Sequence, residues 1–399
     1  MAENEKQKST SKKTANKMSP KQREAKSKKK LIIFGVEVFI ILIMVGALYF
    51  VMRSTSVSPH VTVIDPTNIG IAPEVAEKKE AEESPMRGYM NVALFGVDAK
   101  NEKQLYKSSR SDSIMVANIN LETGEIKLVS VFRDSYLNRG NDTYNKCNGA
   151  YSLGGAEQAL RMLNMNLDLD ITDFVTVGYA GLAEVIDGLG GVWIDVDEKE
   201  LKYINSYQCS IIGKYGKKYW EEWGGGAWDS ENLNFTPDDY FTNYEAKKVT
   251  SSGIQLLDGL QATAYCRIRY VGSDFQRTER QREVIKAIES QAKQASLDTL
   301  TKVFNSAAND IYTSLDVNTI MELLPHLADY KVVDESTFPS TKMRVTINMG
   351  AKGSCEVPTD LEQSVKDLHK FLYDDDDYQV SDTVKEIAEQ IKADASKYR

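Results

Sequence analysis

The sequence contains few of the side chains from which many catalytic and metal sites are built. Only three histidines and four cysteines occur among 399 residues, and no two cysteines form a C-x-x-C pair. A zinc site and a histidine-based catalytic triad therefore have little to build on. Internal repeats of solenoid period, EF-hand spacing and a helix-turn-helix pattern are absent as well. The cysteines could pair outside the cell, but the sequence does not indicate which.

Positive charge is concentrated in the first 30 residues and is outnumbered by negative charge in the rest of the chain. The first 30 residues hold eleven Lys and Arg against three Glu, although the whole chain has a net charge of −9. The remainder is strongly acidic, which argues against nucleic-acid binding by the folded part. We expect the basic tail, residues 1–30, to be disordered, to lie in the cytoplasm and to sit on anionic lipid.

One long apolar run follows the basic tail. Residues 31–52 contain a single charged side chain, Glu37, and about 20 apolar residues suffice to span a bilayer. The positive-inside rule places the N-terminus in the cytoplasm. We therefore predict a single-pass membrane protein whose remaining chain is extracellular. A cleaved signal peptide is the weaker alternative, because the run is long and lacks an alanine-type cleavage site.

Beyond the apolar run, strand-like and helical patterns alternate. Residues 53–88 are polar and are interpreted as a linker. Strands are expected at 90–96, 113–119, 125–132, 174–177, 192–196 and 342–348, and helices at 155–165, 180–189, 361–373 and 382–392. The alternation predicts an α/β fold with a mixed β-sheet covered by helices. It assigns a core domain to 89–295 and a C-terminal helical extension to 296–399.

Residues 200–250 interrupt the alternation with tryptophan, tyrosine and glycine. We interpret them as an aromatic, glycine-rich insertion over the sheet. It is either a carbohydrate-facing lid or an ordinary surface excursion.

A hairpin in the first half of the core domain brings acids and an arginine together. If Asn120 faces Glu125 across the loop, Asp112 lies opposite Arg133. Asp98 ends the preceding strand at the same edge. Carboxylates at such an edge suit a magnesium ion bound to a substrate phosphate. The alternative is that both aspartates are ordinary turn or cap residues.

An arginine-rich stretch lies near the end of the second third of the chain. Period-two alternation over 263–270 predicts a strand with Arg267 and Arg269 on one face. A helix is expected to follow, with Arg277, Gln281, Val284 and Ile288 along one stripe. Arginines beside a helix N-terminus favour an anion such as phosphate. The alternative is a solvated helix with alternating charge.

These stretches together resemble the LytR-CpsA-Psr family. The matching segments run in the family's order over 90–290: Phe95-Gly-Val-Asp98, Arg110-Ser-Asp112, Ser130-Val-Phe-Arg-Asp134, Lys146-Cys-Asn-Gly-Ala-Tyr151, Gly190-Gly-Val192, Ala264-Tyr-Cys-Arg-Ile-Arg269 and Asp274-Phe-Gln-Arg-Thr-Glu-Arg-Gln281. The resemblance implies an Mg²⁺-dependent phosphotransferase. Such an enzyme moves a glycopolymer from a polyprenyl pyrophosphate carrier to peptidoglycan, and residues 89–295 become its catalytic domain.

The resemblance also implies roles for single residues. Asp98 and Asp112 would hold the magnesium ion, with manganese as an alternative. The side chains implied to bind the pyrophosphate are Arg110, Arg133, Arg267, Arg269, Asp274, Arg277 and Gln281. The catalytic set comprises Asp98, Asp112, Arg133, Arg267 and Arg269, whereas Arg110 and Asp274 would order the site. The lipid tail would lie in an apolar tunnel between sheet and helices.

Departures from the family's motifs leave the polymer and its acceptor open. Phe132 stands where proline is frequent, and Cys147 and Gly149 replace commoner residues. A polyprenyl-pyrophosphate hydrolase using the same residues is one alternative function. A non-catalytic, membrane-anchored regulator or scaffold that binds lipid-linked intermediates is another.

Overall fold

A computed structural model describes residues 60–99, 102–212, 216–224, 244–269, 271–272, 274–307, 310–315 and 330–398. No helix within these ranges is both long and apolar enough to cross a membrane. The expected basic tail, 1–30, and the expected membrane span, 31–52, lie outside the described residues.

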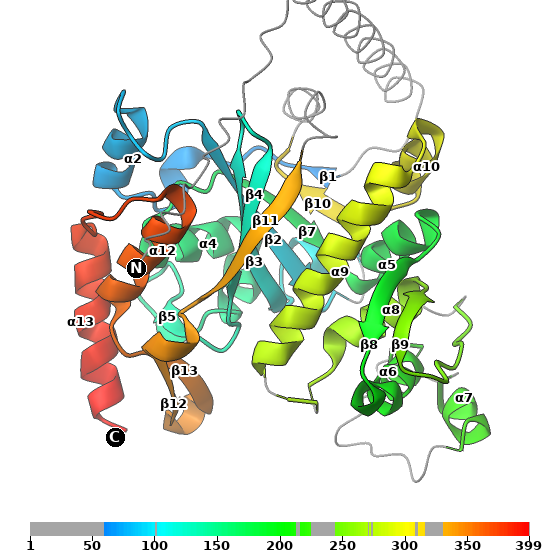
Figure 1. Cartoon of the computed structure of the whole chain (residues 1–399). Helices are drawn as coiled ribbons and strands as arrows, with labels where there is room; N and C mark the ends of the chain where they lie inside the picture. The colour runs from blue at the N-terminus through cyan, green and yellow to red at the C-terminus, as the bar shows by residue number, and fades with distance from the viewer. Residues whose placement is uncertain are drawn as a thin grey trace, which may run out of the picture. The chain divides into compact units, whose positions relative to one another are not determined.

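The central element is a mixed sheet with strand order β1-β10-β7-β2-β3-β4-β11 (Figure 1). Its strands are β1 (His60–Val61), β10 (Ile311–Thr313), β7 (Asp173–Val177), β2 (Tyr89–Val97), β3 (Ser111–Asn120), β4 (Glu125–Val131) and β11 (Lys331–Phe338). Strands β2, β3 and β4 are antiparallel neighbours, whereas β7 runs parallel to β2 and β11 parallel to β4. The expectation of a mixed sheet is confirmed.

The β3–β4 hairpin has the register that the sequence predicts. Ile119 pairs with Ile126 and Met115 with Ser130, the pairing that follows from Asn120 facing Glu125. The turn closes on Gly124, which has a φ of +73° and donates its N–H to the Asn120 carbonyl at 2.8 Å. Glycine adopts this left-handed conformation without steric cost, so the loop length and the register are fixed together.

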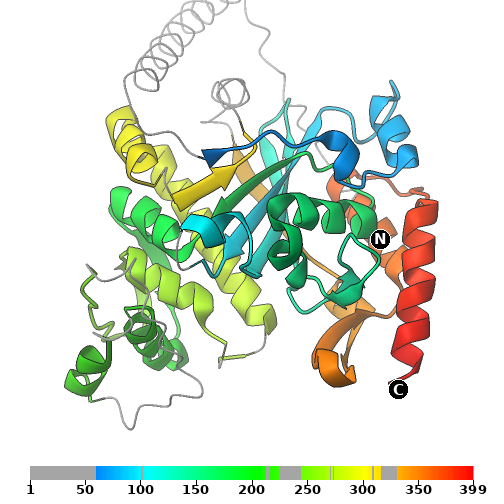
Figure 2. The same cartoon turned by 180° about the vertical axis from the view of Figure 1, so that it is seen from behind.

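Helices cover both faces of the sheet. Helix α4 (Gly149–Leu167) lies on the face turned to the viewer in Figure 2, whereas α9 (Asp274–Gln294) crosses the opposite face, seen in Figure 1. Helices α12 (Leu361–Tyr373) and α13 (Asp382–Ser396) pack against α4. Ser381 caps α13 through a hydrogen bond from the Val384 N–H.

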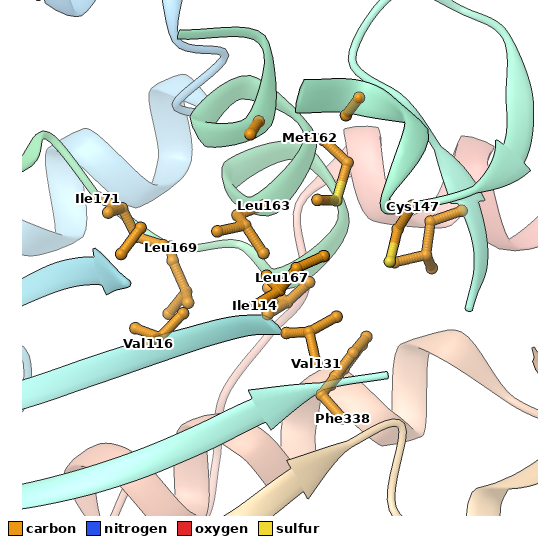
Figure 3. Close-up of a cluster of buried hydrophobic side chains, with 14 of the residues drawn as sticks. Ile114, Val116, Val131, Cys147, Met162, Leu163, Leu167, Leu169, Ile171 and Phe338 are labelled. Atoms are coloured by element: carbon orange, nitrogen blue, oxygen red, sulfur yellow. The ribbon is translucent and has the colours of Figure 1, made fainter. Parts of the chain in front are cut away.

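The face toward α4 is densely packed. Figure 3 shows Ile114 and Val116 of β3 in one cluster with Leu163 and Leu167 of α4. These side chains are all nearly inaccessible to solvent. Because side chains alternate across a strand, their neighbours in β2 and β3 point to the other face.

A second cluster of buried side chains joins α5 (Tyr179–Gly188), α6 (Glu198–Ile211), α8 (Gly259–Arg267) and the middle of α9. The short sheet of β8 (Val192–Val196) and β9 (Gly253–Leu257) belongs to it. The remaining elements are α2 (Pro73–Glu80), α3 (Glu102–Tyr106), α7 (Gly216–Glu222), α10 (Leu297–Ala307), the hairpin β5 (Tyr136–Asn138) and β6 (Tyr144–Lys146), and the hairpin β12 (Arg344–Asn348) and β13 (Ser354–Pro358).

The strand predicted over 263–270 is wrong, because 263–267 belong to α8 and 268–269 are in neither a helix nor a strand. Asp258 and Gln261 form a capping box, each accepting the other's backbone N–H at 2.9 Å. Residues 259–266 are all buried. A helix buried on every side shows no 3.6-residue polar period, so its sequence did not reveal it.

Residues 198–211, expected within an irregular insertion, form α6. A second capping box starts this helix, with the Asp197 N–H donating to Glu200 Oε2 at 2.9 Å. Part of the expected insertion, 225–243, lies outside the described residues.

The two segments on either side of the expected core domain, 53–88 and 296–399, contribute more to the fold than was expected from the sequence. Ile69, Val75 and Met86, from the expected linker 53–88, are buried in the main core. In the expected helical extension 296–399, β10 and β11 add strands to the central sheet. Strand β11 is an edge strand with mostly exposed side chains, so it shows no apolar alternation.

The four cysteines, Cys147, Cys209, Cys266 and Cys355, are all free and buried. The structure therefore contains no disulfide between them.

Candidate active site

A cavity of about 710 Å³ lies between the sheet and helices α5, α6, α8 and α9. Its apolar wall comprises Leu94, Met115, Val175, Val177, Leu182, Val185, Val284, Ile285, Ile288 and Ile311. Its charged and amide side chains are Asp98, Asp112, Arg267, Arg269, Arg277 and Gln281. One cavity thus combines a cationic and carboxylate-bearing region with an extended apolar lining. An amphiphile with an anionic head would match both parts.

The acids enter the cavity from adjacent strand ends. Asp98 follows the end of β2, and Asp112 is the second residue of β3. The pairing of the two strands shifts after Gly96, and the Asp98 N–H then donates to the Arg110 carbonyl at 3.3 Å. The edge position expected for both aspartates is confirmed.

Asp112 joins two arginines that are remote in the sequence. Its Oδ1 accepts from Arg133 Nη1 at 2.7 Å, and its Oδ2 accepts from Arg269 Nη2 at 3.3 Å. Burial is the largest single influence and opposes ionisation, but Arg133, Arg277 and Arg269 together hold the pKa of Asp112 below its ordinary value. Asp112 is therefore an anchored carboxylate and a weak base.

Arg133 is held from a second side as well. Its Nε lies 3.7 Å from Asp134 Oδ2, and the other Asp134 oxygen lies 3.2 Å from Lys146 Nζ. Arg133 does not line the cavity itself. Its geometry indicates that it fixes Asp112 from behind.

Arg267 and Arg269 reach the cavity because α8 ends at Arg267. Ile268 has a ψ of 123°, outside the helical range, so the chain turns away from the helix axis before Arg269. The Arg267 guanidinium lies over the ring of Tyr179, 4.7 Å from its centroid, and 5.8 Å from the ring centroid of Tyr207. Burial acts most strongly on the pKa of Arg267 and lowers it, yet Tyr179, Asp98 and Asp112 raise it overall.

Helix α9 presents the stripe that the sequence predicts. Arg277, Gln281, Val284 and Ile288 all line the cavity. Arg277 is only 2 % exposed, and Gln281 Nε2 donates to the Cys266 carbonyl at 3.4 Å. The stripe therefore runs from polar to apolar along the cavity wall.

The alternative of a solvated, charge-alternating helix is wrong. Arg280 is buried and pairs with Glu200 at 2.6 Å. Arg282 is buried as well and donates to Ser130 Oγ at 2.9 Å. These two arginines fasten α9 to α6 and to the sheet, which leaves Arg277 to face the cavity.

Three predicted site residues are not among the cavity lining that the structure describes: Arg133, which was also predicted to bind the pyrophosphate, Arg110 and Asp274. The Arg110 side chain is exposed and is not part of the lining. Asp274 is the first residue of α9, and its side chain lies outside the description. Arg110 contributes its carbonyl to the strand edge, not its guanidinium to the cavity.

Tyr179 and Tyr207 are cavity residues that the sequence did not single out. Tyr179 begins α5 and Tyr207 lies in the middle of α6. Neither belongs to a local pattern that signals a site. Only the packing of α5 and α6 against α8 brings both rings to Arg267.

The carboxylates fit magnesium only in company with a phosphate. Within the described ranges, no three His, Cys, Asp or Glu side chains gather closely enough to hold a metal. Asp98 and Asp112 nevertheless supply hard oxygen donors to one cavity. Magnesium commonly uses one or two carboxylates, with water and substrate phosphates completing its octahedron. The donor set therefore fits a metal that arrives with a phosphorylated ligand.

Named proteins of similar sequence and fold are known. The chain is 24 % identical over 327 residues to the polyisoprenyl-teichoic acid–peptidoglycan teichoic acid transferase TagT of Bacillus subtilis (strain 168), covering 79 % of this chain and 88 % of that protein. It is 25 % identical over 299 residues to the corresponding transferase TagU of Enterococcus faecalis (strain ATCC 700802 / V583), covering 73 % and 80 %. The solved structure of the LytR-CPS2A-psr family protein YwtF (TagT) with bound octaprenyl pyrophosphate lipid superposes with a TM-score of 0.52. That match has 19 % identity and covers 79 % of this chain and 98 % of the other, so it supports the fold.

The family model described as the LytR_cpsA_psr family matches residues 64–366, which is most of the chain. The resemblance in the motifs is thereby confirmed, and the chain belongs to this family.

Proposed function

We propose that the protein is a phosphotransferase that moves a glycopolymer from a polyprenyl pyrophosphate carrier to peptidoglycan. Family membership and the names of the similar proteins, which are teichoic acid–peptidoglycan transferases, support this function. The glycopolymer is accordingly an anionic polymer of the teichoic acid kind.

The observation that carries the proposal is the mixed chemistry of the cavity. Arg267, Arg269 and Arg277 offer guanidinium groups, which fit phosphate oxygens in bidentate fashion. The adjoining wall is apolar over six structural elements, β2, β3, β7, β10, α5 and α9. A ligand with a pyrophosphate and a long hydrocarbon chain would use both parts at once.

In this mechanism, the arginines bind and orient the pyrophosphate. Arg269 and Arg277 lie close enough to Asp112 to depress its pKa, so the three side chains share one electrostatic environment. Gln281 adds an amide beside them. The aliphatic wall excludes water from the prenyl chain and fixes which end of the carrier faces the opening.

The reaction is a displacement at phosphorus. A sugar hydroxyl of peptidoglycan attacks the phosphorus that bears the glycopolymer, and the bond from that phosphorus to the bridging oxygen breaks. Polyprenyl phosphate leaves with the bonding electron pair, while the arginines stabilise the added negative charge. Both oxygens of Asp112 already engage arginines, so Asp98 would accept the hydroxyl proton, on the carboxylate oxygen that does not bind the metal.

Asp98 and Asp112 would hold a magnesium ion, or manganese in its place. When bound, the metal would neutralise the pyrophosphate and polarise its phosphorus–oxygen bonds. The depressed pKa of Asp112 keeps this ligand ionised at neutral pH.

We also propose that residues 31–52 anchor the protein in the membrane, with 1–30 in the cytoplasm and the chain from residue 53 on outside. The apolar run and the preceding basic tail support this topology. An anchor would hold the cavity beside the bilayer that contains its carrier. Protease added to intact cells should release the extracellular part of the chain and leave the N-terminal tail uncut. Protection of both parts would contradict the topology.

One assay separates the transferase from its alternatives. The full-length chain in detergent is incubated with a radiolabelled oligosaccharide on polyprenyl pyrophosphate, peptidoglycan fragments and Mg²⁺. Label covalently attached to the fragments is the expected result. Release of a free phosphorylated sugar, independent of the acceptor, would indicate a hydrolase. Retention of the carrier without turnover would indicate a regulator or scaffold. Omission of Mg²⁺ with retained turnover would remove the metal from the proposal.

A further inference from the structure

The arginines around the cavity are held in two different ways. Arg133 and Arg269 each form an ion pair with Asp112, at 2.7 Å and 3.3 Å. Arg267 makes no hydrogen bond or ion pair with another side chain in the part of the chain that the structure describes. Its guanidinium instead packs over aromatic rings, 4.7 Å from the Tyr179 centroid and 5.8 Å from the Tyr207 centroid.

Aromatic rings and carboxylates hold a guanidinium with opposite consequences for ligand binding. A carboxylate neutralises the cation and occupies its N–H donors. A ring face attracts the cation through its quadrupole and leaves the donors, which lie in the guanidinium plane, available. The rings therefore hold the Arg267 guanidinium in place while its N–H donors remain available to a ligand.

The two rings come from separate helices and converge only in the folded chain. Tyr179 is at the start of α5, and Tyr207 is on the cavity side of α6. Both tyrosines line the same cavity as Arg267. Rotamer freedom of a long side chain costs free energy when a ligand orders it, so a guanidinium ordered in advance binds an anion more tightly.

We propose that Tyr179 and Tyr207 are positioning residues whose ring faces orient the Arg267 guanidinium for the pyrophosphate of the lipid carrier. The inference rests on the proposed function and adds a specific role for two residues outside the motifs. A purely structural role, as members of the buried cluster of α5, α6 and α8, is the competing explanation.

The test measures binding of geranylgeranyl pyrophosphate to the full-length chain in detergent by titration calorimetry. Tyr179→Leu should weaken binding about fivefold to tenfold, and Tyr207→Leu, whose ring is farther away, about twofold to threefold. Tyr179→Phe and Tyr207→Phe keep the ring faces and should bind within about twofold of the wild type. A structural role that needs the hydroxyl would instead make the Phe and Leu variants equally weak, which would overturn the inference.

A double-mutant cycle separates positioning from general damage. In the Arg267→Ala background, Tyr179→Leu should have no further effect on binding, because the cation that its ring orients is gone. An equal loss in both backgrounds would overturn the inference. Tyr203→Leu is the matched control, since Tyr203 lies on α6 and packs against the same cluster without lining the cavity. It should leave binding unchanged, and thermal denaturation of each variant verifies folding.

The same experiment distinguishes this inference from the proposed function. If the wild type does not bind geranylgeranyl pyrophosphate, both the proposed pyrophosphate site and the positioning role of the tyrosines are contradicted. If the wild type binds, Arg267→Ala weakens binding and the tyrosine variants show no coupling, only the positioning role is lost.

Discussion

The two faces of the central sheet are built from the same strands but differ in what lies against them. In β2 and β3, Ala93 and Ile114 belong to the packed core beneath α4, whereas their neighbours Leu94 and Met115 line the cavity beneath α5 and α9. Both sets are apolar, so hydrophobicity alone does not distinguish the faces. The difference lies in the opposing helices, which fill the space on one side and leave about 710 Å³ on the other.

This contrast indicates that one face of the sheet stabilises the fold, whereas the other provides the cavity. Protein interiors normally contain few voids larger than a water molecule, because unfilled space forfeits dispersion contacts. A large apolar cavity is therefore sustained by packing elsewhere, here by the α4 face and by the cluster of α5, α6 and α8. Substitutions on the two faces should consequently affect different measurements.

The largest effect is expected at the polar part of the cavity. Asp112→Ala removes the carboxylate that engages Arg133 and Arg269, and should lower turnover by about 10²- to 10³-fold. Affinity for geranylgeranyl pyrophosphate should fall far less, because the arginines remain and their positive charge is no longer offset. Steady-state kinetics and calorimetry measure the two quantities. Asp334→Ala, an exposed aspartate in β11, is the control and should retain activity. Wild-type turnover in Asp112→Ala would contradict the assignment of the site.

The packed and open faces can be compared directly with adjacent residues of β3. Ile114→Ala should reduce the free energy of unfolding by about 2–5 kcal/mol, because it opens a void in a filled core. Met115→Ala should cost less than Ile114→Ala, since the Met115 side chain borders a cavity and makes fewer packing contacts on that side. Urea denaturation followed by tryptophan fluorescence measures both. Equal costs would mean that the open face is packed as tightly as the other.

Local patterns predicted those parts of the site that depend on neighbouring residues. The hairpin loop determines the register that joins Asp112 to Arg133, and the helical period determines that Arg277 and Gln281 share a stripe. Each relation needs only the geometry of one strand pair or one helix. Both were therefore accessible from the sequence.

The remainder depends on contacts between elements and could not be predicted. Helix α8 is buried all round and carries no amphipathic period, so Arg267 was assigned to a strand. Tyr207 reaches Arg267 only because α6 packs on α8. Strand β11 is recognisable only through its parallel pairing with β4. Arg110 belongs to a site motif but contributes backbone only, a distinction that requires coordinates.

A smaller effect is expected from filling the open face. Ile288→Trp adds bulk to the apolar wall and should weaken binding of geranylgeranyl pyrophosphate about tenfold, while inorganic pyrophosphate binds as before. Calorimetry with the two ligands separates prenyl from pyrophosphate binding. Ile254→Trp is the matched control, because Ile254 is 73 % exposed on β9 and outside the cavity. If Ile288→Trp weakened both ligands equally, the apolar wall would not bind the prenyl chain.

The smallest effect is expected on the pH dependence of stability, through one buried titratable group on each side of the sheet, His369 and Glu184. His369, on the packed side, is buried with its ring stacked on Tyr378 and its Nε2 at 3.1 Å from the Leu167 carbonyl, and burial lowers its pKa to about 3. Because this folded-state pKa lies below the ordinary value, the stabilisation is complete above about pH 6.5 and is lost as the pH falls toward 3.

Glu184, on the cavity-side helix α5, should act in the opposite direction. Burial first, and then repulsion from Asp310 and Asp187, raises its pKa to about 7. Its stabilising contribution is therefore present below about pH 4.5 and is lost as the pH rises through 7. The melting temperature should be measured between pH 5 and pH 8. His369→Gln keeps a donor for the Leu167 carbonyl and should make the melting temperature fall less as the pH is lowered toward 5. Glu184→Gln should instead raise stability at pH 8 relative to the wild type. Burial disfavours the charged form of both groups, so the opposite signs arise because His369 is a base and Glu184 an acid. If both substitutions changed the profile in the same direction, the pKa shifts assigned to the two groups would be wrong.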